Sequence, residues 1–473
     1  MYSMQRILFM LPTVCFFISV QTAQAQVQTV SLTDFGALAN DNRSDQLAFN
    51  KAAGYINARK GNTRLIIPKG KYLVGITYKN IETIETGLAT INDVMQLKDC
   101  SNVTIEGSGA VVIKFADDLP FGTLPNKTGK DSAVHIGSLF RLINCSNISL
   151  LNFETNGNSE RFRLLRPWGT GDNPYEREHE GLFILNCQQV SVTNVSFLNF
   201  GRDGAMILQD ADKLPVKDIS FTNCTLNGNG RDGLSWCGGE NIHLYNCRFN
   251  NNGKGRITTN PGSGLDIEPE RYALCKKGTI IKCEFSNNAG YSVVSGYETA
   301  SDVTFDSCII TGNTNYALLC ASPRFRFMNT SIAGTSLLSY DAADEKDGMN
   351  FFNCTFTDSL LKKKTFMASY LVSVTGRYAR FSRCSFTGYK VPVLYTEIRK
   401  KKASGDTENT LFGNCSFNAY FKKASTWGKH GFLVSNSRFV DCSFRSGGYA
   451  GFKPIMDDAG KNVQQQKSIF VNN

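Results

Sequence analysis

A short unit built around a cysteine recurs along this chain and limits the folds that are open to it. The unit is about two dozen residues long and is clearest in residues 194–319. After each cysteine come an Asn/Gly turn and a short apolar strand, such as Gly233-Leu234-Ser235-Trp236. The copies are Asn223-Cys224, Asn246-Cys247, Lys282-Cys283 and Ser307-Cys308, followed by Asn329-Thr330, Asn353-Cys354, Arg383-Cys384, Asn414-Cys415 and Asp441-Cys442. Because one such unit cannot bury its apolar face alone, the repeat predicts a solenoid of stacked coils.

The composition indicates that this solenoid is all-β. Phe, Val, Ile and Thr accompany abundant Asn, Gly and Ser, and the chain has only 12 prolines. Such a mixture favours many short strands joined by tight turns. A solenoid grows by adding coils, so 473 residues do not require a second domain.

The 15 cysteines are expected to be mostly free and buried. In an exported protein so many cysteines would ordinarily suggest disulfides. Here most of them occupy the same place in successive coils, where they would stack as an inward-facing ladder of small, soft side chains. Cysteines in adjacent coils would be about 4.8 Å apart, which is close enough for isolated disulfides to form. None of the cysteines has the C-x-x-C spacing of a metal site.

Residues 1–25 have the pattern of a cleaved secretory signal. Arg6 precedes an apolar run over residues 7–20, and Ala23-Gln24-Ala25 supplies small residues before Gln26. We therefore expect an exported protein, periplasmic or secreted. No other segment approaches the length needed to cross a bilayer, so no membrane span is predicted.

The segment that follows carries a specific resemblance. It contains Val30-Ser31-Leu32-Thr33-Asp34-Phe35-Gly36-Ala37, a helical pattern over residues 47–56 with Ser44 as its expected N-cap, and Leu65-Ile66-Ile67-Pro68-Lys69-Gly70-Lys71-Tyr72-Leu73-Val74. This segment resembles the N-terminal cap of the pectate-lyase-like superfamily, which has the pectin lyase fold. The resemblance implies a right-handed parallel β-helix, a three-sheet solenoid with an N-terminal capping helix. It also implies a carbohydrate substrate but no particular reaction.

These observations divide the chain into four parts. Residues 1–25 are the signal peptide, 26–95 the N-terminal cap and first coil, 96–450 the parallel β-helix, and 451–473 a closing tail. The formal charge of +10 would attract polyanions. In an exported protein an acidic polysaccharide is a better partner than nucleic acid, and the oligomeric state is left open.

Long insertions in the early coils bring basic residues together with aromatic ones. The largest insertion spans residues 158–179 and contains Arg163, Arg166, Trp168 and Arg177. Arginine beside aromatic rings suits carboxylates or sulfates on sugar rings. Together with Lys254, Arg256 and Tyr291, these residues are the predicted substrate-binding set. A solvated loop packed by its own aromatic residues is the alternative.

Acidic residues are predicted to gather along one edge of the solenoid. Aligning the coils puts His179-Glu180-Gly181-Leu182, Arg202-Asp203-Gly204-Ala205 and Arg231-Asp232-Gly233-Leu234 in register. The next coil has Gly262-Ser263 there and supplies Asp266 and Glu268 instead. Because side chains alternate along a strand, Asp266 and Glu268 are expected to face outward together.

Three uses fit such an edge, and the sequence leaves them open. In a polysaccharide lyase acting on uronates, Asp203, Asp232 and Asp266 hold Ca²⁺, or a cationic side chain neutralises the uronate carboxylate directly. The candidates for the base or the neutraliser are His179, Arg202, Arg231, Lys254, Arg256 and Tyr291. In a glycoside hydrolase, Asp203, Asp232, Asp266 and Glu268 supply the catalytic pair. In a non-catalytic glycan-binding solenoid, Asp-Gly is turn chemistry alone. We expect a lyase first and a hydrolase second, with a binding solenoid or C5-epimerase behind them. The predicted catalytic set is His179, Arg202, Arg231, Asp232, Asp266 and Glu268.

Overall fold

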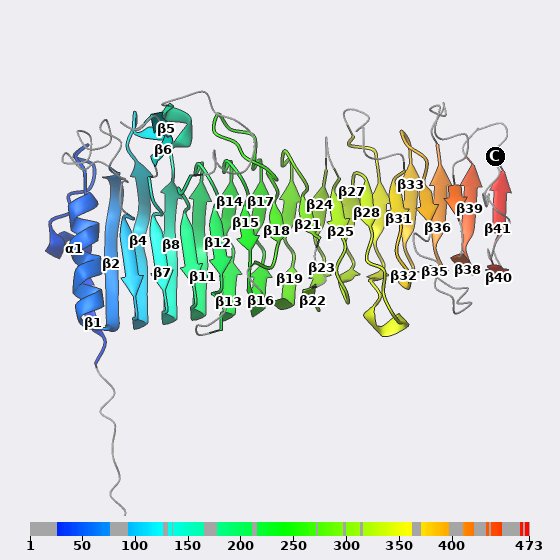
Figure 1. Ribbon diagram of the computed structural model, residues 1–473, viewed down its shortest axis with the longest axis horizontal. Coiled ribbons are helices and arrows are strands. Elements are labelled where there is room, and N and C mark those ends of the chain that lie inside the picture. Colours follow the sequence, from blue (N-terminus) through cyan, green and yellow to red (C-terminus); the bar gives the residue numbers. More distant parts are fainter. Residues whose placement is uncertain are drawn as a thin grey trace, which may run out of the picture.

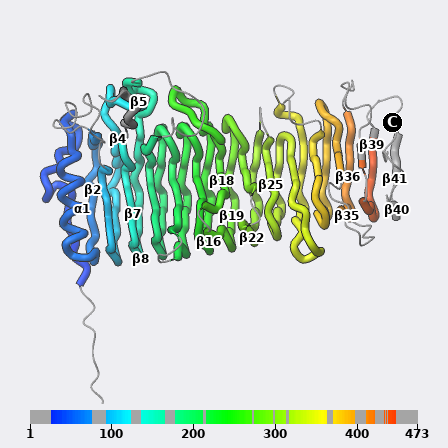
Figure 2. The backbone as a smooth tube through the Cα atoms, in the orientation of Figure 1, coloured from blue at the N-terminus to red at the C-terminus, as the bar shows by residue number. Residues whose placement is uncertain are grey.

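The chain forms a long parallel β-helix, seen in a computed structural model (Figure 1). The structure describes residues 26–75, 93–125, 131–134, 136–164, 177–210, 215–270, 273–296, 299–312, 316–361, 370–396, 410–420, 432–434, 437–446, 464–466 and 469–472. The predicted signal peptide and most of the closing tail therefore lie outside the described residues. Successive coils follow one another from the helix α1 (Gln46–Ala58) at one end toward the strand β36 (Ser416–Ala419) near the other (Figure 2).

The largest sheet has 26 strands and covers two faces of the solenoid. Long N-terminal strands run along both faces: β1 (Gln28–Ser31), β2 (Gly61–Val74), β4 (Ser101–Phe115), β8 (Ser146–Asn156) and β11 (Gln188–Leu198). From there each coil contributes two short strands. On the first face are β13 (Lys217–Thr222), β16 (Gly239–Tyr245), β19 (Cys275–Ile281), β22 (Ala300–Ser301), β23 (Thr304–Asp306), β26 (Arg326–Met328), β29 (Asn350–Phe352), β32 (Ala379–Ser382), β35 (Thr410–Gly413), β38 (Ser437–Val440) and β40 (Gln464–Gln466). On the second are β14 (Thr225–Asn227), β17 (Arg248–Asn250), β20 (Glu284–Ser286), β24 (Ile309–Thr311), β27 (Ser331–Ala333), β30 (Thr355–Thr357), β33 (Ser385–Gly388), β36 (Ser416–Ala419), β39 (Ser443–Ser446) and β41 (Ile469–Asn472).

A second sheet of 12 parallel strands closes the third face. Its strands are β3 (Met95–Lys98), β7 (Phe140–Ile143), β10 (Leu182–Leu185), β12 (Ala205–Leu208), β15 (Leu234–Trp236), β18 (Leu265–Ile267), β21 (Val293–Ser295), β25 (Leu318–Cys320), β28 (Ser336–Leu338), β31 (Val372–Val374), β34 (Leu394–Thr396) and β37 (Phe432–Val434). The predicted all-β parallel solenoid with three faces is confirmed, and two of its faces share one continuous sheet.

Small elements cap and decorate the coils. The capping helix α1 (Gln46–Ala58) buries Phe49, Ala52 and Ile56 against the first coil. Its N-cap is Asp45, one residue after the expected Ser44, whose hydroxyl accepts from the Gln46 amide at 3.4 Å. The other elements are β5 (Pro120–Pro125), β6 (Asp131–Val134), β9 (Arg163–Leu164), η1 (Leu32–Phe35), η2 (Ser159–Arg161) and η3 (Glu345–Asp347). Within the described residues no helix has both the length and the apolarity to cross a membrane.

The corner before each repeated cysteine explains the residue types found there. The residue preceding the cysteine has a left-handed backbone, with φ of 53° at Asn223, 52° at Asn353 and 52° at Asp441. Asn and Asp tolerate this conformation better than most residues because their short side chains bond locally. Asn246 donates to the Asn223 side chain at 2.8 Å, so neighbouring coils are also joined at this corner.

The cysteines themselves point inward and are free. All cysteines among the described residues are buried and unpaired, as predicted. The Cys247 thiol donates to the carbonyls of Phe221 and Tyr245 at 3.4 and 3.3 Å. Thr330 takes the place of a cysteine in its coil, and its hydroxyl accepts from the Cys308 amide at 3.3 Å. The stacked cysteines therefore fill the core and form hydrogen bonds with the backbone.

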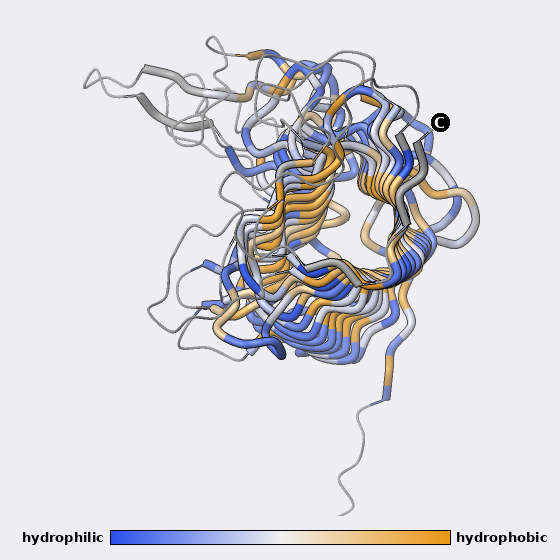
Figure 3. Tube along the Cα trace, turned by 90° about the vertical axis from the view of Figure 1, so that its right-hand side faces the viewer, coloured by the Kyte–Doolittle hydropathy of each residue, from blue (hydrophilic) through white to orange (hydrophobic). Residues whose placement is uncertain are grey.

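Stacked phenylalanines fill the C-terminal half of the core. Phe351, Phe381 and Phe412 follow one another with centroid separations of 4.7 and 4.8 Å and nearly parallel rings. This separation equals the rise between coils, so each ring lies on the ring of the previous coil. Seen along the solenoid, apolar positions superimpose from coil to coil (Figure 3).

Phe381→Ala tests this stack. The ring is buried with rings on both sides, so we expect a loss of about 3–5 kcal/mol of stability from lost contacts and a cavity. Thermal unfolding measures it. Phe352→Ala is the control, because Phe352 is 42% exposed on the outer face, and it should change the melting temperature little.

Candidate functional site

Acidic residues line the edge of the 12-stranded sheet where its strands begin. Leu182, Ala205, Leu234 and Leu265 are paired through β10, β12, β15 and β18, so the residues two positions earlier are also in register. Those residues are Glu180, Asp203, Asp232 and Ser263, and the first coils extend the series to Asp93 and Ser138. We call these six residues the edge row. The predicted alignment of the coils is confirmed.

Part of the edge row has a structural task. Asp203 accepts a hydrogen bond from the Asp232 amide at 3.0 Å, and Asp232 accepts one from the Ser263 amide at 2.6 Å. Each carboxylate thus joins its coil to the next. The glycine that follows is needed because a Cβ at Gly233 would lie 2.6 Å from the Gly264 carbonyl oxygen. The Asp-Gly dipeptide therefore does serve the turn, as the structural alternative proposed.

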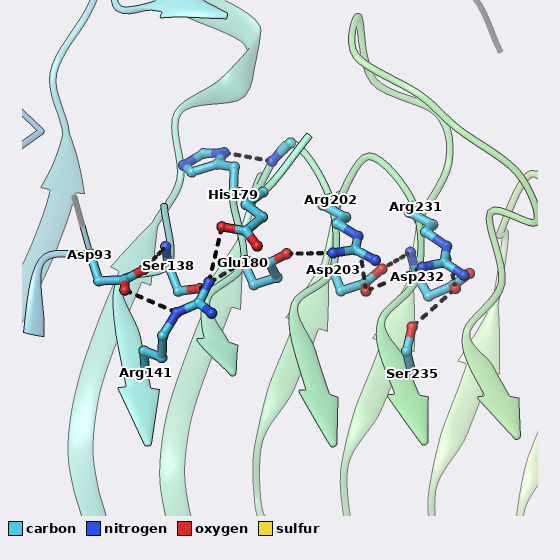
Figure 4. Close-up of polar contacts among 12 residues, drawn as sticks. Asp93, Ser138, Arg141, His179, Glu180, Arg202, Asp203, Arg231, Asp232 and Ser235 are labelled. Carbon is cyan, nitrogen blue, oxygen red and sulfur yellow. Dashed lines mark hydrogen bonds and ion pairs between the residues drawn. The ribbon is translucent and has the colours of Figure 1, made fainter. Parts of the chain in front are cut away.

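Three arginines place positive charge between the acids (Figure 4). Arg141 contacts Asp93 at 2.9 Å and Glu178 at 3.2 Å, and Arg202 contacts Glu180 at 3.0 Å. The Ser138 hydroxyl donates to Glu180 at 2.7 Å and connects the two groups. The Glu180 side chain is fully buried, and a buried ion is tolerated only when it is paired.

Arg231 is at the centre of the acidic residues. Its guanidinium lies 3.8 Å from Asp203, 3.4 Å from Asp232 and 3.7 Å from Glu268, and its side chain is 7% exposed. Asp203 and Asp232 are fully buried. Burial raises the pKa of Asp232 to about 7, against the opposing effect of Arg231. This carboxyl can therefore exchange a proton near neutral pH.

The sequence predicted that Asp266 and Glu268 face outward together as a pair. In the structure the two side chains differ in exposure. Asp266 is 5% exposed, whereas the Glu268 side chain is 31% exposed. Met206 of β12, Ser235 of β15 and Asp266 of β18 are paired in register across three adjacent strands. All three are buried, so this face of the sheet is covered here. Burial, and then the charges of Asp232 and Glu268, raise the pKa of Asp266 well above its usual value.

His179 lies in the core and not among the carboxylates. Its ring packs against Phe115, Phe162 and Phe200 with centroids 4.7 to 5.2 Å away. Its Nδ1 accepts from the Gly201 amide at 2.8 Å. Burial lowers the pKa of His179 to about 3, so the imidazole is neutral. The predicted role as a base at the acidic edge does not fit this placement, because Phe162 of the insertion and Phe115 and Phe200 of the coils enclose the ring.

The predicted substrate-binding residues divide into separate places. Arg177 is buried and donates to the Gly122 carbonyl at 3.4 Å, so it supports the insertion. Exposed Arg163 faces Asp118 at 3.7 Å. Exposed Arg256 bonds the Phe162 carbonyl at 3.0 Å, which joins two insertions from distant coils. Arg166 and Trp168 lie outside the described residues.

Lys254 and Tyr291 border the site from the following coils. Exposed Lys254 donates to Asn287. Tyr291 is half-buried, follows Ser263 in register, and its ring lies 6.2 Å from Tyr316 at 12°. A tyrosine therefore continues the edge row one coil beyond Ser263.

The expected calcium ligands are not gathered around a common point. Within the described residues, no group of three or more His, Cys, Asp or Glu side chains is arranged to hold a metal ion. Arg231 lies between Asp203 and Asp232, and its guanidinium supplies the positive charge that a cation would bring. The metal set Asp203, Asp232 and Asp266 is therefore not supported by the geometry.

Sequence reasoning missed the N-terminal end of the site. Asp93, Ser138, Arg141 and Glu178 join the ion-pair network, although no candidate was named there. Aligning residues 93 and 138 with Glu180 would have found two of them. A pocket of about 450 Å³ lies beside Asp93. Its other lining residues come from α1 and β3 and are Asn50, Ala53, Gly54, Asn57 and Gln96.

Comparisons with known proteins agree with this architecture. The family model described as a right-handed β-helix region matches residues 180–359. This match covers less than half of the chain, and the parallel β-helix fold seen in the structure extends beyond it in both directions. No curated protein sequence resembles it closely enough to count as a match.

Among solved structures, the β-helix resembles gene product 12 of bacteriophage phi29, in its pre-mature form. The TM-score is 0.54 at 14% identity, and the match covers 94% of this chain but only 56% of that protein. The AlgE6 A-module, a mannuronan C-5 epimerase of Azotobacter vinelandii, matches with TM-score 0.42 and 12% identity over 93% of this chain and 99% of its own. The tailspike gp49 of Acinetobacter baumannii bacteriophage Fri1, a capsular polysaccharide depolymerase, matches with TM-score 0.41 and 14% identity, over 92% and 64%. The likeness to the phi29 protein concerns the fold alone.

His179→Asn separates the core role of this residue from a catalytic one. The native imidazole binds fewer protons than the unfolded one between pH 6.5 and about 3, so its contribution to stability is lost as the pH falls through this window. We expect the wild type to lose up to about 1.4 kcal/mol per pH unit relative to the variant. The raised pKa of Asp232 acts in the opposite direction, so the two proteins are compared at each pH. A constant difference in unfolding free energy across pH would contradict the neutral buried imidazole.

Proposed function

We propose that this protein is an exported polysaccharide-degrading enzyme whose site is formed by Asp232, Asp266 and Glu268. The observation that carries the proposal is the different environment of two neighbouring carboxyl groups. Asp266 is buried, and burial raises its pKa well above the usual value; Glu268 is partly exposed and lies 3.7 Å from Arg231. Carboxyl pairs whose environments drive their protonation apart are typical of acid–base catalysis on sugars.

The roles follow from these environments. Asp266, whose pKa burial raises well above its usual value, is suited to protonate a leaving glycosidic oxygen. Glu268 lies 3.7 Å from Arg231 with a partly exposed side chain and is suited to activate water or attack the anomeric carbon. Asp232 supports the pair, because its carboxyl contributes to the raised pKa of Asp266. This assignment favours glycoside hydrolysis.

β-Elimination is the second candidate, and Tyr291 favours it. The residue is half-buried and one coil beyond Ser263 on the same edge, so its hydroxyl is a candidate base for a uronate C5 proton. The other predicted bases are less suited. His179 is enclosed by aromatic rings, while Arg202 and Arg231 are paired with carboxylates. A lyase therefore depends on Tyr291 or on an exposed cation such as Lys254.

An acidic polysaccharide is the substrate class that the overall charge favours. The +10 charge attracts a polyanion from a distance. Export rests on the signal-like pattern of residues 1–25, and calcium remains a prediction from the sequence.

One assay distinguishes the reactions. The mature protein is incubated with uronate polymers and with neutral glycans, with and without EDTA, while ultraviolet absorbance and reducing ends are followed together. A hydrolase produces reducing ends without new absorbance, and we expect this result unchanged by EDTA. Absorbance of an unsaturated product establishes elimination, and its loss in EDTA restores the calcium hypothesis. Neither signal on any glycan contradicts the proposed enzyme.

Glu268→Gln tests the carboxylate pair. We expect kcat to fall about 10²- to 10⁴-fold, since the amide can neither activate water nor attack carbon. Glu284→Gln is the matched control, because Glu284 is 37% exposed and faces Arg248 at 3.9 Å on another face of the solenoid. Equal activity of the two variants would remove Glu268 from the mechanism.

A further inference from the structure

Two copies of Gly-Arg-Asp-Gly lie in adjacent coils, and their arginines have different surroundings. Arg202 belongs to residues 201–204 and pairs with Glu180 of the preceding coil at 3.0 Å. Arg231 belongs to residues 230–233 and reaches forward to Glu268 of the following coil at 3.7 Å. Identical motifs therefore have different partners.

Strand register explains this difference. Trp236 of β15 pairs with Ile267 of β18, so Cys237 and Glu268 occupy equivalent places in adjacent coils. The coil after Arg202 offers the Cys237 thiol there, whereas the coil after Arg231 offers a carboxylate. Of the two copies, only residues 230–233 are followed by a coil with an acidic residue, Glu268, at this position.

We propose that Arg231 is a positioning residue that holds the Glu268 carboxylate against the edge row in the orientation needed for reaction. This inference rests on the proposed function of Glu268. The guanidinium contacts carboxylates of three consecutive coils, Asp203, Asp232 and Glu268, at 3.4 to 3.8 Å. A planar fork with five donors suits such a junction better than an ammonium does.

The carboxylates around Arg231 argue against direct recognition of substrate. Its guanidinium already faces Asp203, Asp232 and Glu268, so its positive charge is compensated within the chain. Among these three carboxylates, that of Glu268 is the one open to solvent, with 31% of its side chain exposed. Arg231 therefore acts through Glu268.

The backbone around Arg231 is secured by other contacts. The Asp232 amide bonds to Asp203, the Ser263 amide bonds to Asp232, and the Gly233 amide bonds to the Ser263 carbonyl at 2.9 Å. These bonds join the coils without the guanidinium. Glu268 is anchored through its own amide to the Trp236 carbonyl at 3.0 Å, which leaves its side chain to be oriented by Arg231.

The charged and titratable groups around Glu268 come from several elements. Asp266 interacts with Glu268 directly, while Asp203, Asp232 and Cys237 interact with its partner Arg231, and Glu270 interacts with Cys237. Carboxyl groups predominate, so removing the guanidinium leaves Glu268 among like charges and without its attractive partner. Glu268 is then expected to turn toward solvent.

The experiment compares Arg231→Lys and Arg231→Met with the same changes at Arg377. Arg377 is the matched control because its side chain is also 7% exposed and its guanidinium bonds both Asp341 oxygens, at 2.6 and 3.1 Å, several coils away between β31 and β32. We expect Arg231→Met to lower kcat about 10- to 100-fold, the effect of a small misplacement of a reacting group, with little change in KM. Arg231→Lys should recover part of kcat because the positive charge remains. The Arg377 variants should lose stability and keep the wild-type kcat.

Two results would overturn the proposal. If KM rises while kcat is kept, Arg231 contacts substrate. If kcat is unchanged, or falls only as far as in Arg377 variants of equal stability, its role is structural alone.

Thermal unfolding tests the contact without any activity. Arg231→Met, Glu268→Gln and the double variant form a cycle, and we expect the second change to shift the melting temperature less once the first is present. Additive shifts would show that the two side chains do not interact and would overturn the proposal. If the cycle shows coupling while the wild type cleaves no glycan, the contact is real and the proposed function has failed.

Discussion

Hydrogen bonding between successive coils is the constraint on which the whole molecule depends. Each coil leaves backbone groups unpaired along its edges, and only another coil of the same shape satisfies them. The left-handed corner at Asn223 and its counterparts makes the coils superimpose, and the inward cysteines and stacked phenylalanines fill the interior at the same spacing. Residues of one type therefore recur because they perform one task in every coil.

The edge row shows how this repetition produces a chemical site. Asp203 and Asp232 first serve the backbone, since each accepts an amide of the next coil. Stacking then brings these acids into one buried series, where arginines must compensate them. In the coil that replaces Asp with Ser263, the acids appear instead at Asp266 and Glu268. The site lies where the repeat is broken.

The contrast between Arg202 and Arg231 shows how duplicated sequence acquires separate roles. Both arginines precede an Asp-Gly turn, and both neutralise the edge row. The residue offered by the following coil, Cys237 in one case and Glu268 in the other, decides whether the guanidinium reaches beyond the row. In a repeat protein, a substitution in one coil can thus give a residue of the adjacent coil a different role.

The sequence by itself determined the solenoid, the inward free cysteines and the alignment of Glu180, Asp203 and Asp232. These features depend on local periodicity and on turn residues, which a linear pattern records directly. The sequence did not determine how deeply each side chain is buried or which residues surround it. Only the tertiary structure decided that Asp266 is buried while Glu268 is partly exposed, that aromatic residues enclose His179, and that Arg231 lies between Asp203 and Asp232. The physical reason is that burial and charge pairing depend on side chains from other coils and from insertions such as residues 158–164, whose position in space the repeat does not encode.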